Sequence, residues 1–170
     1  MRQLDLCTGS GCVAITMARQ RPTSRVFATD LSPDALAVAR ENAYRLGAYN
    51  VAFLESDLFA SIPADARFDV ITANPPYIAS AEIETLMPDV RDFEPRMALD
   101  GGADGLDFVR RIVEGAPAFL DPEGVLAIEI GAGEAAATRA LFEDRGYRDV
   151  AVEKDYAKIE RVVSGVRPQG

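Results

Sequence analysis

Histidine is absent from the 170 residues, and the chain has only two cysteines, Cys7 and Cys12. Without histidine, the chain cannot use imidazole as a base, nucleophile or metal ligand, which excludes Ser-His-Asp triads and histidine-containing zinc sites. The cysteine spacing is not that of a C-x-x-C redox pair, and no second pair completes a zinc site. We therefore expect no metal site, and we expect both cysteines to be small packing residues.

A long apolar run and an excess of basic residues are also missing. No apolar run approaches the roughly 18 residues that indicate a membrane span. Residues 1–15 contain one basic residue, Arg2, and no cleavage-like site, so we expect a cytoplasmic protein that has no membrane partner. The net charge is -9. Because DNA affinity depends on Lys and Arg displacing counterions from phosphates, this charge argues against a large nucleic-acid footprint.

Short β-rich segments alternate with helical segments along the chain. Strands are predicted at 3–6, 25–29, 51–54, 68–73, 125–130, 147–153 and 160–164, and helices at 11–20, 33–46, 106–120 and 134–145. Strands separated by helices predict right-handed crossovers and a mostly parallel sheet with helices on both faces, which is an α/β fold. The length suits a single domain.

Local signals support several of these boundaries. Ser32 is a good N-cap, Pro33 suits the first helical position, and Gly47 is expected to end that helix. The apolar run at 125–130 suits a strand that is buried on both faces. One long irregular stretch covers roughly 74–105, and stretches of that length in compact domains are usually functional.

A Gly-rich turn follows the first predicted strand, in the sequence Asp-Leu-Cys-Thr-Gly-Ser-Gly that starts at Asp5. Glycine lets the backbone approach a ligand closely, and ligands of open α/β sheets bind at the carboxyl ends of the strands. Asp30, at the end of the second strand, can accept both ribose hydroxyls of an adenosine. The alternative is that the turn needs glycine only for its geometry and that Asp30 only caps the next turn. A G-x-G-x-x-G dinucleotide fingerprint is absent, because Cys7 stands where its first glycine would be, and Gly9 and Gly11 are followed by Ala14 rather than by glycine.

A second acidic residue, Asp57, follows the third predicted strand. In a Rossmann-like cofactor site this position lies beside the adenine. Asp57 would accept the adenine amino hydrogens, and Leu58 would pack on the ring. The alternative interpretation is that Asp57 is a solvated acid in a turn.

The sequence Asn74-Pro75-Pro76-Tyr77 directly follows the fourth predicted strand. A planar amide or exocyclic amine is a poor nucleophile because its lone pair is delocalised. The Asn74 side-chain carbonyl and the Pro75 backbone carbonyl can hold the NH2 group as attack proceeds, and the prolines stiffen the loop. Tyr77 offers an aromatic face to the planar target. Catalysis then depends on positioning and electrostatic stabilisation, with no strong base.

Together these motifs resemble class I S-adenosylmethionine methyltransferases. Asp-Leu-Cys-Thr-Gly-Ser-Gly-Cys, Ala-Thr-Asp-Leu-Ser-Pro and Asn-Pro-Pro-Tyr-Ile are similar to the HemK/PrmC family, as is the segment from Val90 to Asp107. That family methylates the glutamine of the Gly-Gly-Gln motif in peptide-chain release factors. The resemblance implies a seven-stranded sheet in the order 3-2-1-4-5-7-6 with the last strand antiparallel. It implies S-adenosylmethionine as cofactor, S-adenosylhomocysteine as product, and a release factor as protein partner.

The resemblance and the chemistry above give one set of candidate site residues. The predicted cofactor-binding residues are Asp5, Cys7, Thr8, Gly9, Ser10, Gly11, Asp30, Leu31, Asp57, Leu58 and Asn74. The predicted substrate-binding residues are Asn74, Pro75, Pro76 and Tyr77, of which Asn74, Pro75 and Tyr77 are the predicted catalytic residues.

Members of the family usually carry a helical amino-terminal domain that helps to bind the release factor. We expect residues 1–170 to be the methyltransferase domain alone, without that domain, and to be a monomer. Three alternatives stay open: a ribosomal-protein glutamine methyltransferase, a DNA or RNA methyltransferase that acts on an exocyclic amine of a flipped base, and a non-catalytic cofactor-binding subunit. The sequence Arg-Asp-Phe-Glu-Pro, which starts at Arg91, favours the release-factor branch.

Overall fold

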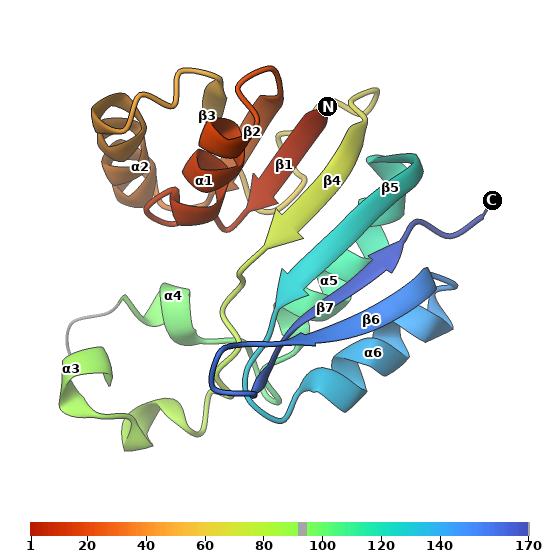
Figure 1. Ribbon diagram of the computed structural model, residues 1–170. Coiled ribbons are helices and arrows are strands. Elements are labelled where there is room, and N and C mark those ends of the chain that lie inside the picture. The colour runs from red at the N-terminus through yellow and green to blue at the C-terminus, as the bar shows by residue number, and fades with distance from the viewer. Residues whose placement is uncertain (92–94, 170) are drawn as a thin grey trace.

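The computed structural model describes residues 1–91 and 95–169, and its centre is one seven-stranded sheet (Figure 1). The strands are β1 (Arg2–Leu6), β2 (Arg25–Asp30), β3 (Val51–Glu55), β4 (Phe68–Ala73), β5 (Leu120–Glu129), β6 (Arg148–Lys154) and β7 (Glu160–Val166). Their order in the sheet is β3-β2-β1-β4-β5-β7-β6. Neighbours from β3 to β5 are parallel, and β7 is antiparallel to both β5 and β6. The predicted fold class and strand order are therefore confirmed.

Helices flank the sheet on both faces (Figure 1). They are α1 (Cys12–Gln20), α2 (Pro33–Arg45), α3 (Pro88–Arg91), α4 (Arg96–Leu99), α5 (Asp107–Gly115) and α6 (Ala135–Asp144), with 3-10 turns η1 (Ile83–Thr85) and η2 (Ala116–Ala118). The start of α2 is as predicted, because the Ser32 side chain accepts a hydrogen bond from the Ala35 N–H at 3.2 Å. The left-handed φ of +69° at Gly47 ends that helix, also as predicted. No helix within the described ranges is long and apolar enough to cross a membrane.

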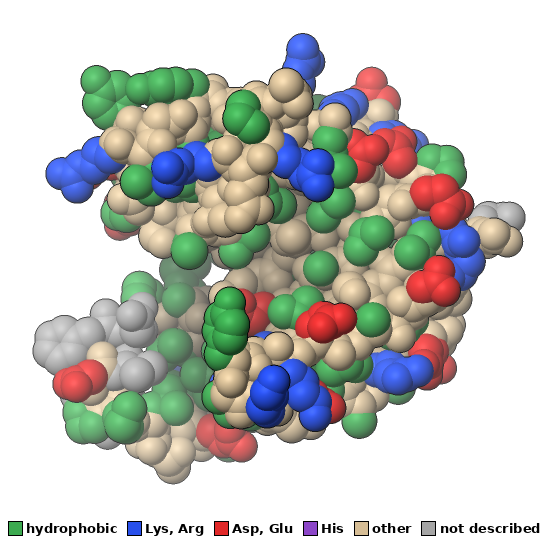
Figure 2. Space-filling model, in the orientation of Figure 1, with side chains coloured by type: hydrophobic (Ala, Val, Ile, Leu, Met, Phe, Trp, Pro, Cys, Tyr) green, Lys and Arg blue, Asp and Glu red, His purple; other side chains and the backbone are tan. Residues whose placement is uncertain are grey.

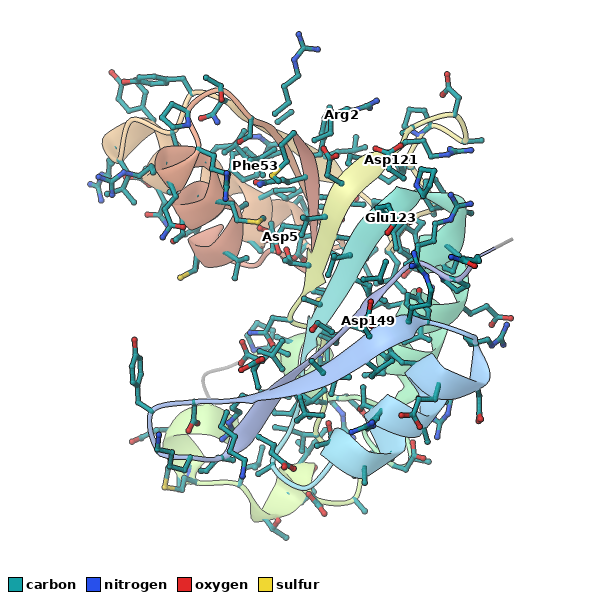
Figure 3. The ribbon with its side chains drawn as sticks, turned by 45° about the vertical axis from the view of Figure 1, so that its right-hand side comes forward. Arg2, Asp5, Phe53, Asp121, Glu123 and Asp149 are labelled. Atoms are coloured by element: carbon teal, nitrogen blue, oxygen red, sulfur yellow. The ribbon has the colours of Figure 1, made fainter. Side chains whose placement is uncertain are left out.

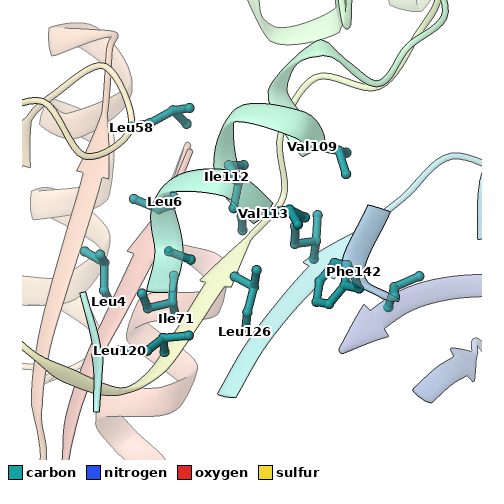
Figure 4. Close-up of a cluster of buried hydrophobic side chains, with 14 of the residues drawn as sticks. Leu4, Leu6, Leu58, Ile71, Val109, Ile112, Val113, Leu120, Leu126 and Phe142 are labelled. Atoms are coloured by element: carbon teal, nitrogen blue, oxygen red, sulfur yellow. The ribbon is translucent and has the colours of Figure 1, made fainter. Parts of the chain in front are cut away.

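The larger core lies between the sheet and helices α5 and α6 (Figure 4). Strand side chains such as Leu4, Ile71 and Leu126 are fully buried against Ile112 of α5, and Phe142 of α6 extends the same cluster. Each such side chain contributes roughly 1.5–3 kcal/mol when it leaves water. A smaller cluster joins α1 and α2 to β2 and β3. Together the two cores fix the positions of the carboxyl ends of β1, β2 and β4 relative to one another.

Three sequence predictions differ from the structure. The helix predicted at 106–120 ends at Gly115, and a 3-10 turn that contains Pro117 follows, because proline cannot donate to the helical ladder. The strand predicted to be buried on both faces is only half-buried at Val125 and Ala127, since α1 and α2 lie over β1–β3 rather than over β5 (Figure 1). The stretch predicted as irregular contains η1, α3 and α4.

Candidate active site

A pocket of about 850 Å³ lies at the carboxyl ends of β1, β2, β3 and β4. The sheet order reverses between β1 and β4, since β1 pairs with β2 on one side and with β4 on the other. Ligands of open α/β sheets bind at such a switch point. Figure 2 shows this face of the molecule hollowed between the α1–α2 side and the short helices that follow β4. The pocket is lined by all of the predicted site residues except Gly11.

Asp5 forms the buried base of the Gly-rich turn, at the end of β1 beside α1 (Figure 3). Its carboxylate accepts hydrogen bonds from the hydroxyls of Thr8 and Thr72, both at 2.6 Å, so it ties the turn to β4. The residue is only 2% exposed. Burial raises the pKa of Asp5 to about 6, against the opposing effect of the two hydroxyl hydrogen bonds. Asp5 therefore titrates closer to neutral pH than an aspartate side chain in water does.

The two glycines of the turn have different tasks. Gly9 lies in the pocket wall with a left-handed φ of +55°, and an added Cβ would meet no atom within 4 Å, so the backbone faces open space. Gly11 has a φ of +84°, and an added Cβ would lie 2.9 Å from the Ile15 side chain and 3.2 Å from Ala39. Gly11 therefore permits close packing of α1 on α2, away from the pocket lining.

Asp30 is held in place by two backbone N–H groups. Gly9 donates to its Oδ2 at 2.8 Å, and Ser32 donates to its Oδ1 at 2.9 Å. Each carboxylate oxygen retains a further lone pair, so Asp30 can still accept a ligand hydroxyl. Because Gly9 is itself in the pocket wall, this pair of bonds also couples the Gly-rich turn to the end of β2.

Asp57 lines the pocket and forms an ion pair that the sequence did not indicate. Arg111 of α5 donates to the Asp57 carboxylate at 2.8 Å, and the Arg111 guanidinium also lies 5.7 Å from the centre of the Phe108 ring. Phe108 and Leu58 both line the pocket, and Leu58 is only 6% exposed. Asp57 and Arg111 are 54 positions apart, and no motif links them. The predicted acid beside the adenine is therefore already partnered.

The two cysteines occupy the pocket wall in different states. Burial, together with the charges of Asp30 and Asp5, raises the pKa of Cys7 to about 12, so its thiol stays protonated at neutral pH. Cys12 is exposed. The prediction that both cysteines are packing residues is therefore wrong for Cys12, which opens α1 at the pocket surface.

The Asn-Pro-Pro-Tyr loop forms the opposite side of the pocket. Asn74 is exposed, Pro75 is buried, and Pro76 and Tyr77 are half-buried. The Asn74 side chain makes no hydrogen bond to any of the described residues, and Asn74 lines the pocket. The loop thus brings an amide side chain and a proline-stiffened backbone into the same pocket as Asp30 and Gly9.

A third wall comes from the segment after α3, and no chemical motif in the sequence indicated it. Met97, Leu99 and Asp100 line the pocket together with Phe108. Met97, Leu99 and Asp100 lie in the segment from Val90 to Asp107, which was identified only by its resemblance to the family. Residues 92–94 of the Arg-Asp-Phe-Glu-Pro sequence lie outside the described residues.

The pocket fits S-adenosylmethionine on three grounds. Asp30 presents two oriented acceptors for ribose hydroxyls, Gly9 leaves the backbone open to a ligand, and Leu58 offers an apolar wall for a ring. The buried acid Asp5 adds negative potential to the same pocket, which suits a ligand that carries positive charge.

Comparisons with known proteins agree with this geometry. The profile of a methyltransferase domain family matches residues 1–132. The chain is 47% identical over 162 residues to a release factor glutamine methyltransferase of Geobacter sulfurreducens, covering 95% of this chain and 56% of that protein. It is 49% identical over 166 residues to a release factor glutamine methyltransferase of Cereibacter sphaeroides, covering 97% of this chain and 59% of that protein.

Solved structures show the same fold. A methyltransferase of Pyrococcus furiosus superposes with a TM-score of 0.71 at 21% identity, covering 98% of this chain and 75% of that one. An RNA methyltransferase of Salinibacter ruber, solved in complex with S-adenosyl-L-homocysteine, superposes with a TM-score of 0.61 at 18% identity, covering 99% and 82%. The chain spans 56% and 59% of the length of the two curated relatives above. The matched family profile, the sheet order and the pocket at the switch point agree, and the chain belongs to the family of methyltransferase domains.

Proposed function

We propose that this chain transfers a methyl group from S-adenosylmethionine to the side-chain amide nitrogen of the glutamine in the Gly-Gly-Gln motif of a release factor. The observation that carries the proposal is a single pocket in which Gly9 and Asp30 face the Asn74–Tyr77 loop. Relatives at 47% and 49% identity that are release factor glutamine methyltransferases support the choice of substrate. A substrate that works in translation implies a cytoplasmic reaction.

The cofactor half of the pocket binds by hydrogen bonds and shape. Asp30 accepts the ribose hydroxyls while Gly9 and Ser32 hold its carboxylate in place. Leu58 and Phe108 provide apolar walls for the adenine, and Arg111 fixes Asp57 beside them. When bound, S-adenosylmethionine supplies a methyl group on a positively charged sulfur and leaves as S-adenosylhomocysteine.

The substrate half positions the amide. The Asn74 side-chain carbonyl accepts one hydrogen of the glutamine NH2 group, and the Pro75 backbone carbonyl accepts the other. These two acceptors orient the nitrogen lone pair and stabilise the positive charge that develops on the nitrogen. Tyr77 covers the planar amide, and the prolines prevent the loop from relaxing.

No strong base is required by this arrangement. The nitrogen becomes acidic once it carries a fourth substituent, and its proton then passes to solvent. The absence of histidine from the sequence is consistent with such a mechanism. The thiol of the half-buried Cys7 stays protonated at neutral pH, because its pKa is raised, and it takes no nucleophilic part.

The domain assignment completes the proposal. Residues 1–170 form the methyltransferase domain, and they span 56% and 59% of the length of the two curated relatives. We propose that the domain acts as a monomer, since one pocket of a single chain holds both the residues proposed for the cofactor and those proposed for the substrate.

The decisive experiment uses tritiated S-adenosylmethionine, this chain and a purified release factor. The matched control is the same factor with Gln→Asn in its Gly-Gly-Gln motif. Label that depends on the intact glutamine, and that is lost in Asn74→Ala, supports the proposal. Label on the Gln→Asn factor would contradict the assigned target. Label on ribosomal proteins or DNA instead of on the release factor would show that the enzyme acts on one of the alternative substrates.

A further inference from the structure

The segment that follows α4 pairs, as a short strand-like partner, with the backbone just after the Asn-Pro-Pro-Tyr loop. The Ile78 N–H donates to the Leu99 carbonyl at 3.0 Å, and the Gly101 N–H donates back to the Ile78 carbonyl at 2.8 Å. Ile78 and Asp100 form a parallel β-bridge. The Ser80 N–H then donates to the Gly102 carbonyl at 2.8 Å. The backbone that leaves Tyr77 is therefore paired over several residues, outside the main sheet.

The side chain of Asp100 reinforces this pairing. Its Oδ1 accepts a hydrogen bond from the Ser80 hydroxyl at 2.5 Å and from the Gly102 N–H at 3.1 Å. Arg96 donates to its Oδ2 at 3.4 Å. The hydrogen bonds from Ser80 and Gly102 lower the pKa of Asp100 from its ordinary value, so the carboxylate stays charged at neutral pH. Asp100 thus joins both strands of the pair through one oxygen.

Two glycines in the segment sit where no side chain fits. An added Cβ at Gly105 would overlap the Tyr77 carbonyl oxygen and lie 2.7 Å from Glu134 Oε1. An added Cβ at Gly101 would lie 2.9 Å from the Pro76 carbonyl oxygen. These neighbours are mostly backbone atoms, so a side chain at either glycine would displace the loop itself.

Glu134 anchors the other side of Gly105 to the sheet. Its carboxylate accepts a hydrogen bond from the Gly131 N–H at 2.8 Å, just beyond the end of β5. Gly105 therefore lies between the backbone of Tyr77 and the turn that follows β5. The Asn-Pro-Pro-Tyr loop is therefore held in two ways. It continues directly from β4, and through Gly105 and Glu134 it also packs against the turn that follows β5.

We propose that the segment from Leu99 to Gly105 is a positioning element for the Asn-Pro-Pro-Tyr loop, with Asp100 and Gly105 as its positioning residues. This inference rests on the proposed function, because the task assigned to the segment is to hold the Asn74 and Pro75 acceptors at the transferring methyl group. A misplacement of about 1 Å in such an acceptor can cost 10²-fold in rate. Leu99 and Asp100 line the same pocket as Asp30, but the hydrogen bonds that hold Asp30, from Gly9 and Ser32, do not involve this segment, so the ribose site should keep its geometry when the segment is altered.

The first test is a matched glycine pair. Gly105 and Gly47 have similar left-handed φ angles, +80° and +69°, but an added Cβ at Gly47 meets nothing within 4 Å. Gly105→Ala and Gly47→Ala therefore carry the same backbone strain, and only the first displaces the loop. We expect kcat with the release factor to fall about tenfold or more in Gly105→Ala and to stay within about twofold in Gly47→Ala. Equal effects of the two substitutions would overturn the proposal.

The second test uses Asp100 and does not depend on turnover. In Asp100→Ala, the amides of Ile78 and Ser80 should exchange their hydrogens about tenfold faster, while peptides from β1 and α6 keep their rates. Asp100→Asn retains an oxygen that accepts from Ser80 and Gly102, so it should restore slow exchange. Unchanged exchange in Asp100→Ala would overturn the proposal, even if Gly105→Ala fails to fold.

The kinetic and binding data separate this inference from the proposed function. A fall in kcat of Asp100→Ala, with S-adenosylmethionine affinity by calorimetry unchanged and with rescue in Asp100→Asn, supports a positioning role. An equal loss of cofactor affinity would refute that role, because it would show either that Asp100 contacts the cofactor directly in the pocket that it lines or that the substitution disturbs the fold. If the unsubstituted chain methylates no release factor, the proposed function fails. The exchange experiment still decides whether this segment holds the loop.

Discussion

Replacing Asp5 with asparagine should make the cofactor-free protein more stable at neutral pH. The carboxyl is 2% exposed, and burial raises its pKa from 3.8 to about 6. One pKa unit corresponds to about 1.4 kcal/mol, so ionising Asp5 in the folded state costs up to roughly 3 kcal/mol at pH 7 relative to the unfolded chain. Asparagine is neutral and has nearly the same shape, so it removes this cost.

Hydrogen bonds reduce the expected gain. The hydroxyls of Thr8 and Thr72 both donate to the Asp5 carboxylate, and the asparagine NH2 group cannot accept either of them. One hydroxyl can keep its bond to the remaining oxygen and the other must rotate, at a cost of about 1 kcal/mol. The net gain in unfolding free energy at pH 7 should be about 1–2 kcal/mol.

The pH dependence identifies the cause. A raised carboxyl pKa means that stability is lost as pH rises from 3.8 to about 6, because the folded state binds the proton more tightly than the unfolded state does. The stability difference between Asp5→Asn and the unsubstituted chain should therefore grow between pH 4 and pH 7. Urea denaturation at several pH values measures it, and the other carboxyls cancel in the difference. A constant difference, or a less stable variant at pH 7, would refute the reasoning.

Three further predictions concern other residues. Asn74→Ala should lower turnover by about 10²-fold or more with little change in cofactor affinity, because it removes an acceptor of the transition state; near-normal steady-state rates would contradict this role. Asp30→Ala should weaken S-adenosylmethionine binding by about 1.5–3 kcal/mol, and calorimetry that finds equal affinity would exclude the ribose assignment. Tyr147→Phe should lower unfolding free energy by about 1–2 kcal/mol with normal turnover, since the buried Tyr147 hydroxyl donates to the Val113 carbonyl at 2.9 Å; equal stability in urea would argue against that bond.

Local signals explain which parts of the fold could be predicted. The boundaries of α2 followed from Ser32, Pro33 and Gly47, which act through short-range hydrogen bonds and backbone angles. The antiparallel placement of β7 came from resemblance, because no local pattern encodes which strands become neighbours. The half-buried face of β5 was missed for a related reason, since the sequence of a strand does not say where helices on distant segments will pack.

The residues of the candidate site likewise fall into those that local motifs could predict and those that only the folded structure brings together. Motifs contiguous in sequence, such as the Gly-rich turn and the Asn-Pro-Pro-Tyr loop, identified half of the pocket lining. The Asp57–Arg111 ion pair could not be predicted, because it joins separate segments and leaves no periodic signal. Gly105 carried no signal either, since its requirement arises only when Tyr77 and Glu134 approach it from two other segments.

The insertion of β7 between β5 and β6 has a consequence for how the molecule is made. Along the chain β6 comes before β7, yet β6 joins the sheet through β7, which also covers the free edge of β5. During synthesis, β1 to β4 emerge before β5 and can pair with one another, whereas β5 keeps an open edge until residues 160–166 have left the ribosome. The part of the sheet that carries the pocket can thus assemble before β7 closes the edge of β5.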